Sequence, residues 1–337
     1  MNILMPFLAV LALVVIPLLG AQIDGLKWLF GIVIPYAAIA TFLGFFVAKV
    51  VDWAKSPAPF SIATSGGQAK SLPWVKQSTL DCPSSTAGVV GRMFLEIVCF
   101  RSLFRNTRTS IQAGPRLIYG PTKWLWLFGI LFHYSFFIIF LRHFRLFVDP
   151  VPAPILALDA MDSFFQITLP GLYVTDLLIL GAATFLFLRR VIIPQVRYIS
   201  LANDYFPLFL IFAVCLSGIL MRYIFKVNIA GVKEFLIGLA DFSPSINPEI
   251  GAPFYVHLFL VSTLMAYFPF SKLMHLPGVF MSPTRNLTTN SREVRHLNPW
   301  NDPNIKPHAY EAYEDEFRDF MRDAGLPLEK DPQQPQA

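Results

Sequence analysis

Long apolar stretches alternate with polar connections along most of this 337-residue chain. A helix needs about 20 apolar residues to cross the hydrocarbon core of a bilayer. The pattern therefore predicts an all-α membrane protein with six transmembrane helices. The six stretches comprise residues 3–20, 28–50, 124–148, 172–190, 205–225 and 254–276.

The first apolar stretch has two interpretations. It resembles the apolar core of a signal peptide, but no Lys or Arg precedes it, as a signal peptide would require. We therefore expect residues 1–27 to hold an additional N-terminal transmembrane helix. Cleavage of this segment would not change the orientation of the other helices.

The positive charges are distributed unevenly among the polar connections. Residues 51–123 contain nine Lys and Arg against three acidic residues, whereas residues 149–171 contain no Lys or Arg and three aspartates. The link between the fourth and fifth stretches is basic, and residues 226–253 are mixed. Because cytoplasmic loops carry the excess of Lys and Arg, we expect residues 51–123, the link at 191–204 and both termini to be cytoplasmic.

The composition excludes several classes of protein. Hydrophobic residues make up 55% of the chain and charged residues 15%, whereas soluble domains carry about 25% charged residues. The net charge of +5 is not gathered in a compact basic module, so we expect no nucleic-acid partner. The three cysteines form no CxxC motif, and this pattern supports neither a disulfide framework nor a cysteine-bound cluster.

The polar segments are expected to lie at the cytoplasmic surface. Residues 51–87 are rich in Pro, Ser, Gly and Thr and predict an irregular loop. Residues 88–105 combine apolar and basic positions in a helix-like pattern suited to a membrane surface or a partner. The tail, residues 277–337, begins as an extended segment and then predicts a helix near 308–324. One face of this acidic helix is aromatic, either to dock a partner or to pack on the chain's own loop, and it contains Tyr310, Tyr313, Phe317 and Phe320.

Four histidines lie in or beside the apolar stretches, where an ionisable side chain is costly and therefore suggests a function. His133 and His143 are separated by ten residues in the third stretch, and His257 and His275 by eighteen in the sixth. In a continuous helix, eighteen residues place both side chains on one face about 27 Å apart, and ten residues place them about 15 Å apart. His296 and His308 lie in the polar tail, where we expect them to be solvated.

Antiparallel packing of the third and sixth helices would pair these histidines by depth. His143 then meets His257 near the outer surface, and His133 faces His275 near the cytoplasm. The axial separations differ by about 12 Å, a difference that helix tilt and a kink at Pro269 would have to absorb. A lone histidine often only bonds a neighbouring helix, but two such pairs favour two haem b groups, each held by two imidazoles.

The spacing of the four histidines resembles that of membrane cytochromes b of the nitrate reductase gamma-subunit type. The resemblance covers residues 28–50 and 124–280, and heterodisulfide reductase membrane subunits are similar. The additional first span, the long basic loop and the extended tail most closely resemble the DsrM branch, the membrane cytochromes of the complex associated with dissimilatory sulfite reduction.

The resemblance implies a fold and a set of cofactors. Five of the six spans would form a dihaem bundle, made of residues 28–50 and a four-helix haem-binding region, 124–276. His143 and His257 would ligate the iron of the outer haem, and His133 and His275 that of the inner haem. Menaquinone would be the substrate.

The resemblance also implies partners and a process. The partners would be a cytoplasmic heterodisulfide-reductase-like iron–sulfur subunit, a periplasmic multihaem cytochrome c, a periplasmic iron–sulfur protein and a second membrane subunit. The chain would be the electron-transfer subunit of a quinol/quinone oxidoreductase in the cytoplasmic (inner) membrane, serving sulfite or sulfate respiration.

Other charged residues near the predicted membrane surfaces are candidates for cofactor contacts. Asp176 is a candidate quinone or proton site, or else part of a structural ion pair with Arg222. The outer loop 149–171 has no lysine where the family has one at its outer quinol site. Candidates for haem propionate contacts, with ordinary interfacial snorkelling as the alternative, are Arg142, Arg145, Arg222 and Lys272, with Lys123 behind them.

Two other functional classes are compatible with an apolar chain of this kind. A transporter with a histidine proton path is one, although internal repeats, which are common in such proteins, are not visible here. A haem-free membrane anchor that recruits a soluble partner through its tail is the other. An anchor would not need histidines at matching depths on two helices.

Overall fold

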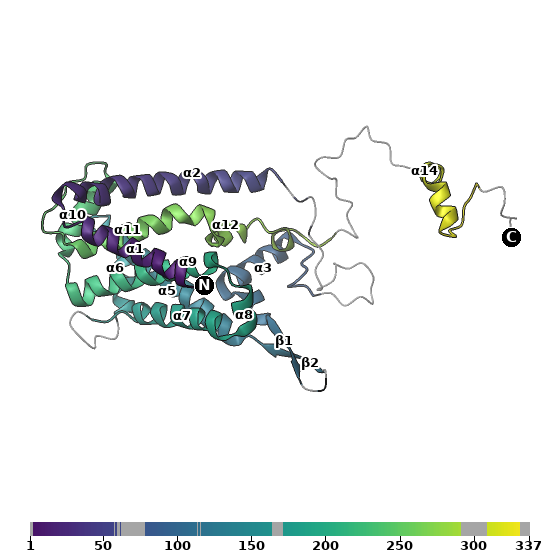
Figure 1. The fold of residues 1–337 in the computed structure, drawn as a ribbon, viewed down its shortest axis with the longest axis horizontal. Coiled ribbons are helices and arrows are strands. Elements are labelled where there is room, and N and C mark those ends of the chain that lie inside the picture. The colour runs from purple at the N-terminus through teal and green to yellow at the C-terminus, as the bar shows by residue number, and fades with distance from the viewer. Residues whose placement is uncertain are drawn as a thin grey trace.

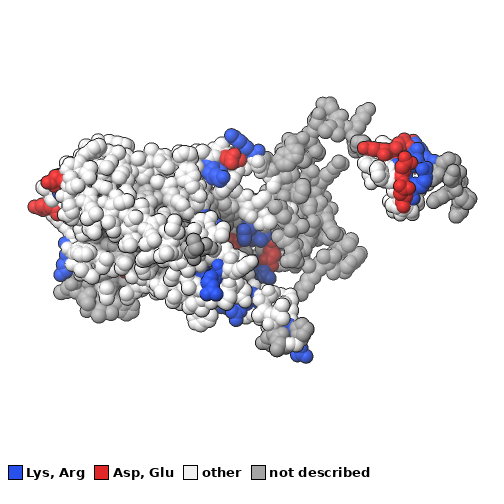
Figure 2. Space-filling model, viewed as in Figure 1, with Lys and Arg blue, Asp and Glu red and all other residues white. Residues whose placement is uncertain are grey.

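The computed structural model describes residues 3–56, 78–112, 116–163, 171–290 and 309–330, and positions 58, 61 and 114. Its long helices lie side by side in a bundle, with a β-hairpin at one end (Figure 1). On the face seen in Figure 2, charged side chains gather toward the two ends of the bundle, and the zone between them is largely uncharged. Most of the predicted loop 51–87 and both tail histidines lie outside the described residues.

Four helical segments in the described part of the chain are long and apolar enough to cross a membrane. They are Asp24–Ala54, Lys123–Leu146, Ala202–Phe225 and Ala252–Phe270. Each coincides with a predicted span. The molecule is therefore a mostly helical, multi-pass membrane protein.

The individual elements of the bundle follow the order of the predicted spans. Short 3₁₀ or π turns extend several of these helices. The helices are α1 (Leu4–Gly20), α2 (Ile34–Ala54), α5 (Lys123–His143), α6 (Ala153–Asp162), α7 (Val174–Ile192), α8 (Pro194–Ile199), α9 (Ala202–Leu220), α10 (Ile229–Ala240) and α11 (Ala252–Tyr267).

The other two predicted spans, α1 and α7, are helices that are shorter or more charged than the four long apolar helices. α1 is apolar but only 17 residues long, and α7 has 19 residues with Asp176, Arg189 and Arg190 among them. α1 nevertheless packs against α9 and α11. Its Val10 joins a buried cluster with Leu210 and Leu260, so α1 is an integral part of the bundle.

Aromatic packing at one end of the bundle fixes the start of α11. Phe30, Phe235, Phe254 and Tyr255 are all buried in one cluster. A Cβ on Gly31 would lie 3.1 Å from the rings of both Phe235 and Tyr255, so the absence of a side chain lets α2, α10 and α11 approach one another. This packing holds the first turns of α11 in place.

The helix predicted over 254–276 ends at Tyr267, and the kink expected at Pro269 is a complete break. Two 3₁₀ turns, Phe268–Phe270 and Lys272–Met274, follow α11, and a short helix α12 (His275–Gly278) begins after them. Pro269 has no N–H to donate to the preceding turn. Ser271 between the two turns is extended (φ −118°, ψ 173°), and its Oγ accepts a bond from the Leu273 N–H at 3.1 Å.

The helix-like stretch predicted over 88–105 is confirmed as two helices, α3 (Thr86–Cys99) and α4 (Arg101–Arg105). The antiparallel hairpin of β1 (Thr107–Gln112) and β2 (Arg116–Pro121) that follows was not predicted, and it corrects the all-α fold class. β-Branched and aromatic residues favour these strands. Gly114 supplies a positive φ of 91° in the connection.

The tail helix predicted near 308–324 is confirmed as α14 (Tyr310–Asp323). It lies apart from the bundle in Figure 1, beyond the short helix α13 (Pro283–Asn286). Glu314 is fully buried and accepts bonds from the N–H groups of Glu329 and Lys330, at 3.0 and 2.9 Å. The segment that follows α14 is thereby folded back onto it, while Tyr310, Tyr313 and Phe320 stay exposed.

Candidate functional site

The structure brings the four histidine side chains together in the two pairs expected from the sequence. The rings of His143 and His257 have centroids 6.3 Å apart and planes 15° apart. The rings of His133 and His275 have centroids 5.9 Å apart and planes 83° apart. The break after α11 explains how both pairs form, because the estimate of about 27 Å assumed an unbroken helix.

The paired rings meet between α5 on one side and α11 and α12 on the other. α5, which bears His133 and His143, packs on α7, whereas α11 packs on α1, α2 and α9. In the described part of the chain, α5 and α11 are not among the helix pairs with extensive backbone contact. The imidazoles of α5 therefore meet those of His257 and His275 through their side chains.

Hydrogen bonds fix which ring nitrogen each histidine leaves free. The Nδ1 atoms of His133 and His143 lie 2.7 Å from the carbonyl oxygens of Gly129 and Ile139, one turn earlier in α5. In the other helices, His275 Nδ1 lies 2.9 Å from the Lys272 oxygen, and His257 Nδ1 lies 2.9 Å from Ser217 Oγ on α9. Hydrogen bonds of this kind orient imidazoles that ligate a metal. They leave the lone pair of Nε2 available to bind a metal ion.

The geometry of the pairs fits a metal ion held between two imidazoles. Metal–nitrogen bonds to imidazole are about 2 Å long, so two imidazoles on opposite sides of one ion have ring centres about 6 Å apart. No described cluster of three or more His, Cys, Asp or Glu residues could hold a metal ion. Two protein ligands per site suit haem iron, which is held by axial ligands from the protein.

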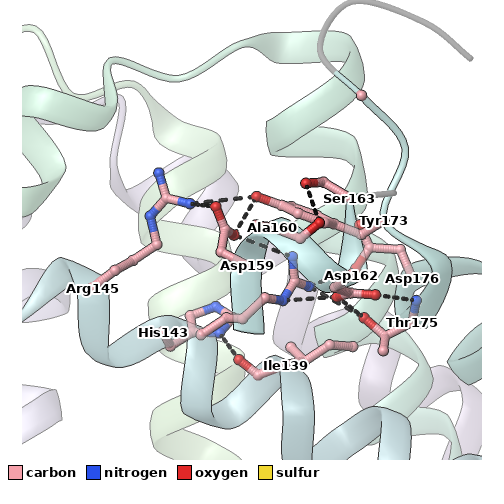
Figure 3. A network of polar contacts seen from close by, with 12 residues as sticks. Ile139, His143, Arg145, Asp159, Ala160, Asp162, Ser163, Tyr173, Thr175 and Asp176 are labelled. Carbon is pink, nitrogen blue, oxygen red and sulfur yellow. Dashed lines mark hydrogen bonds and ion pairs between the residues drawn. The ribbon is translucent and has the colours of Figure 1, made fainter. Parts of the chain in front are cut away.

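A dense polar network lies beside His143, next to it in sequence and space (Figure 3). Arg142 is almost fully buried, with Asp162 at 3.0 Å and Asp176 at 3.4 Å. Asp162 also accepts bonds from the N–H and the hydroxyl of Thr175, at 2.9 and 2.6 Å. The network links the ends of α5 and α6 to the beginning of α7.

Tyr173 lies at the centre of this network. Its hydroxyl donates to Asp159 at 2.6 Å, and Arg145 donates to the other oxygen of Asp159 at 3.0 Å. Its ring lies under two guanidinium groups, with the central carbons of Arg142 and Arg222 at 3.5 and 4.0 Å from the ring centre. These cation–π contacts hold both cations at the same end of the bundle.

The expected ion pair between Asp176 and Arg222 is replaced by a different pair. Asp176 contacts Arg142 and accepts a bond from the Tyr223 hydroxyl at 3.0 Å. Arg222 lies in a π-helical turn, Met221–Phe225, and stacks on Tyr173. Arg142, on the facing helix, has taken the position beside the carboxylate that Arg222 was expected to fill.

The residues proposed as propionate contacts differ in how far their charged groups already have hydrogen-bond or ion-pair partners. Arg142 is surrounded by carboxylates, and Lys272 pairs with Asp204. Lys123 donates to the Phe104 carbonyl at 2.7 Å. Arg222 has a buried Nε without a hydrogen-bond partner, so it retains a donor for an acidic group. Arg145 is partly exposed beside Asp159.

Two contacts to the histidines could not be found by the sequence reasoning. Ser217 bonds His257 from another helix, and its only signal in the sequence is a hydroxyl within an apolar stretch. Phe100 packs edge-on against His133 with centroids 5.0 Å apart. Nothing in the sequence distinguishes it from the other 32 phenylalanines.

Comparison with known proteins agrees with this arrangement. The family described as "Nitrate reductase gamma subunit" matches residues 98–296 of the chain, which include all four histidines. The chain belongs to the nitrate reductase gamma-subunit family. The predicted resemblance is thereby confirmed, and the family match begins after α1 and α2 and ends before α14.

Two curated relatives match most of the chain. The Archaeoglobus fulgidus protein called "Hdr-like menaquinol oxidoreductase cytochrome b-like subunit" is 42% identical, over 82% of this chain and 85% of its own length. The Archaeoglobus profundus protein of the same name is 40% identical, over 80% of this chain and 82% of its own. The similarity therefore extends over about four-fifths of the chain.

Proposed function

We propose that this chain is the dihaem b membrane cytochrome subunit of a menaquinol oxidoreductase. The observation that carries the proposal is the presence of two imidazole pairs, with centroids 6.3 and 5.9 Å apart, between α5 on one side and α11 and α12 on the other. The names of the two archaeal relatives support both the cytochrome b assignment and menaquinone as the substrate.

Each pair would hold one haem b. His143 and His257 would ligate the outer haem, and His133 and His275 the haem nearer the cytoplasm. Haem iron with two axial imidazoles supplies one-electron transfer and has no open position for oxygen or substrate. The contribution of the chain is to hold the imidazoles, orient them through Nδ1 and keep their surroundings apolar.

Oxidation of a menaquinol yields two electrons and two protons. The chain would have to accept the electrons and the protons. The two electrons would leave one at a time through the outer pair of imidazoles. Asp176 would accept the two protons in turn at a carboxylate oxygen, releasing the first to the outer surface before it accepts the second. Arg142 lies between Asp176 and the partly exposed Asp159, and its positive charge would favour the return of Asp176 to the carboxylate form.

The remaining parts of the proposal concern orientation and partners. Six helices would cross the cytoplasmic membrane, α1 and α7 among them, with both termini and the hairpin in the cytoplasm. The electrons would pass to a heterodisulfide-reductase-like iron–sulfur subunit on that side. A periplasmic multihaem cytochrome c, a periplasmic iron–sulfur protein and a second membrane subunit would complete a complex of sulfite or sulfate respiration.

Absorption spectroscopy of the purified protein tests the cofactor assignment. We expect a b-type α-band in the reduced-minus-oxidised spectrum and two haems per chain. His143→Ala and His133→Ala should each remove one haem and leave the other, whereas His296→Ala in the tail should leave both. Absence of the α-band from the wild-type protein would contradict the proposal and favour a membrane anchor or a transporter.

A further inference from the structure

The junction between α3 and α4 has an unusual backbone conformation. Phe100 links the two helices with φ 50° and ψ 47°, in the left-handed region. Residues other than glycine are uncommon there, and a bulky one stays only where its surroundings hold it. We call residues 98–104 the elbow.

The elbow is attached to the helix that carries His133. The Trp126 Nε1–H on α5 donates to the Cys99 carbonyl at 2.8 Å, and the Tyr134 hydroxyl donates to the Val98 carbonyl at 2.9 Å. The last carbonyls of a helix lack partners within the helix. Two side chains of α5 therefore satisfy the end of α3 and set its position relative to His133.

The other side of the elbow is held by charge. Arg101 pairs with Asp81 at 2.5 Å, and Arg105 contacts the second oxygen of the same carboxylate. Ser102 donates to Glu96 through its N–H at 3.1 Å and through its hydroxyl. The elbow is thus fixed from α5 and from its own loop.

These attachments direct the ring of Phe100 at one imidazole. The two rings meet edge to face, with centroids 5.0 Å apart and planes 81° apart. The His133 ring is also bonded through Nδ1 to the carbonyl of Gly129 and packed edge-on against Phe132, with centroids 5.3 Å apart, both within its own helix. Phe100 is an aromatic contact that comes from outside α5, and it lies where it opposes a change in the orientation of the imidazole.

We propose that Phe100 is a positioning residue for His133, and that the elbow sets the plane of this imidazole. The inference rests on the proposed function for the identity of the cofactor. Because outer contacts orient ligands and tune the metal, loss of the ring should change the electronic signature of one haem and leave the other unchanged.

The test compares Phe100→Leu with Phe94→Leu in the full chain. Leucine has the same cost in the left-handed conformation, whereas Phe94 is an exposed ring on α3. For Phe100→Leu we expect both haems to be retained, a shifted low-field g value in the electron paramagnetic resonance spectrum of one haem, and partial carbon monoxide binding by that haem. Phe94→Leu should match the wild type.

Two further variants distinguish loss of the Phe100 ring from a general folding defect. Phe100→Tyr keeps the ring edge and should keep the wild-type spectrum. Trp126→Phe removes only the bond to the Cys99 carbonyl, and a smaller shift of the same signal should follow. Spectra of Phe100→Leu identical to those of Phe94→Leu would overturn the inference. A wild-type protein without two haems would instead show that the proposed function has failed.

Discussion

The four histidines are oriented in two physically different ways. Three of them use a backbone carbonyl three or four residues earlier, so their orientation is decided locally. His257 depends on the Ser217 hydroxyl from α9, which donates its proton to the Val214 carbonyl at 2.9 Å and accepts the Nδ1–H of His257 at 2.9 Å. A Cβ on the neighbouring Gly218 would lie 3.2 Å from the His257 ring. The outer pair therefore depends on how closely α9 approaches α11.

Replacing Ser217 by alanine should weaken the outer haem selectively. The Nδ1 atom of His257 loses its partner. Loss of a hydrogen bond to a metal-ligating imidazole lowers the affinity of the site for its metal by about 10–100-fold. The measurement is haem occupancy during dilution in detergent. Ser262→Ala removes a buried hydroxyl of α11 that bonds only its own helix, and it should retain both haems. Equal loss in both variants would count against a role for Ser217.

Asp176→Asn should slow electron entry without removing a haem. The amide cannot take up a proton as the carboxylate does, whereas Arg142 keeps its contact with Asp162. We expect about a tenfold or larger decrease in the rate of haem reduction by a menaquinol analogue. Asp149→Asn is the control, because Asp149 is largely exposed and pairs with Lys233 at 3.1 Å. An unchanged rate in Asp176→Asn would remove Asp176 from the proton path.

At the scale of elements, the successes and failures of prediction have physical causes. The four apolar helices follow from the length and hydropathy of their segments, and the aromatic helix α14 follows from local periodicity. The extended backbone at Ser271 and the β1–β2 hairpin depend on which hydrogen bonds these segments form with the segments next to them. Local hydrophobic patterns do not determine those bonds. The pairing of Asp176 with Arg142 depends on the relative rotation of α5 and α7, which hydrophobicity alone does not specify.

The break after α11 should be necessary for the inner site. Pro269→Ala restores a backbone N–H and allows the helix to continue past Tyr267. Continuation would carry His275 away from His133, so we expect reduced occupancy of one haem. Pro253→Ala changes the first turn of the same helix, where proline is well tolerated, and both haems should remain. Full occupancy of both haem sites in Pro269→Ala would contradict a requirement for Pro269. The extended Ser271 would then be sufficient to maintain the break.

The contact between the elbow and its loop should weaken in acid. Hydrogen bonds from Arg101 and Arg105 hold the pKa of the Asp81 carboxyl well below its usual range, against the opposing effect of burial. Its native pKa therefore lies below the unfolded value of about 3.9. The stabilisation is complete above about pH 4 and is lost as the pH falls toward the native pKa.

Asp81→Asn should remove that pH dependence. The variant loses the ion pairs at neutral pH, which we expect to lower the local stability of α3 and α4 by about 1 kcal/mol. Hydrogen exchange of α3 amides between pH 6 and pH 3 is the measurement. Wild-type protection should decrease toward the acid end, whereas the variant should begin lower and change less. Parallel pH profiles would rule out Asp81 as the responsible group.

At the scale of the whole molecule, sidedness can be tested with the native cysteines. Cys99 is exposed at the elbow, Cys82 is buried and Cys215 lies within α9. The distribution of Lys and Arg predicts that the elbow is cytoplasmic. A membrane-impermeant maleimide should therefore label Cys99 in inside-out vesicles but not in right-side-out vesicles, and Cys99→Ser should abolish the labelling. The opposite pattern would reverse the proposed orientation.

The pairing of the α5 histidines with those of α11 and α12 also has a consequence for biosynthesis. His143 and His257 are separated by 114 residues in the chain, and α11 is the last of the long apolar helices to be made. Neither imidazole pair exists in a nascent chain that has not yet inserted α11. On the proposed function, haem capture would therefore be a late event in assembly, and a chain that stalls before α11 would contain two half-sites and no complete one.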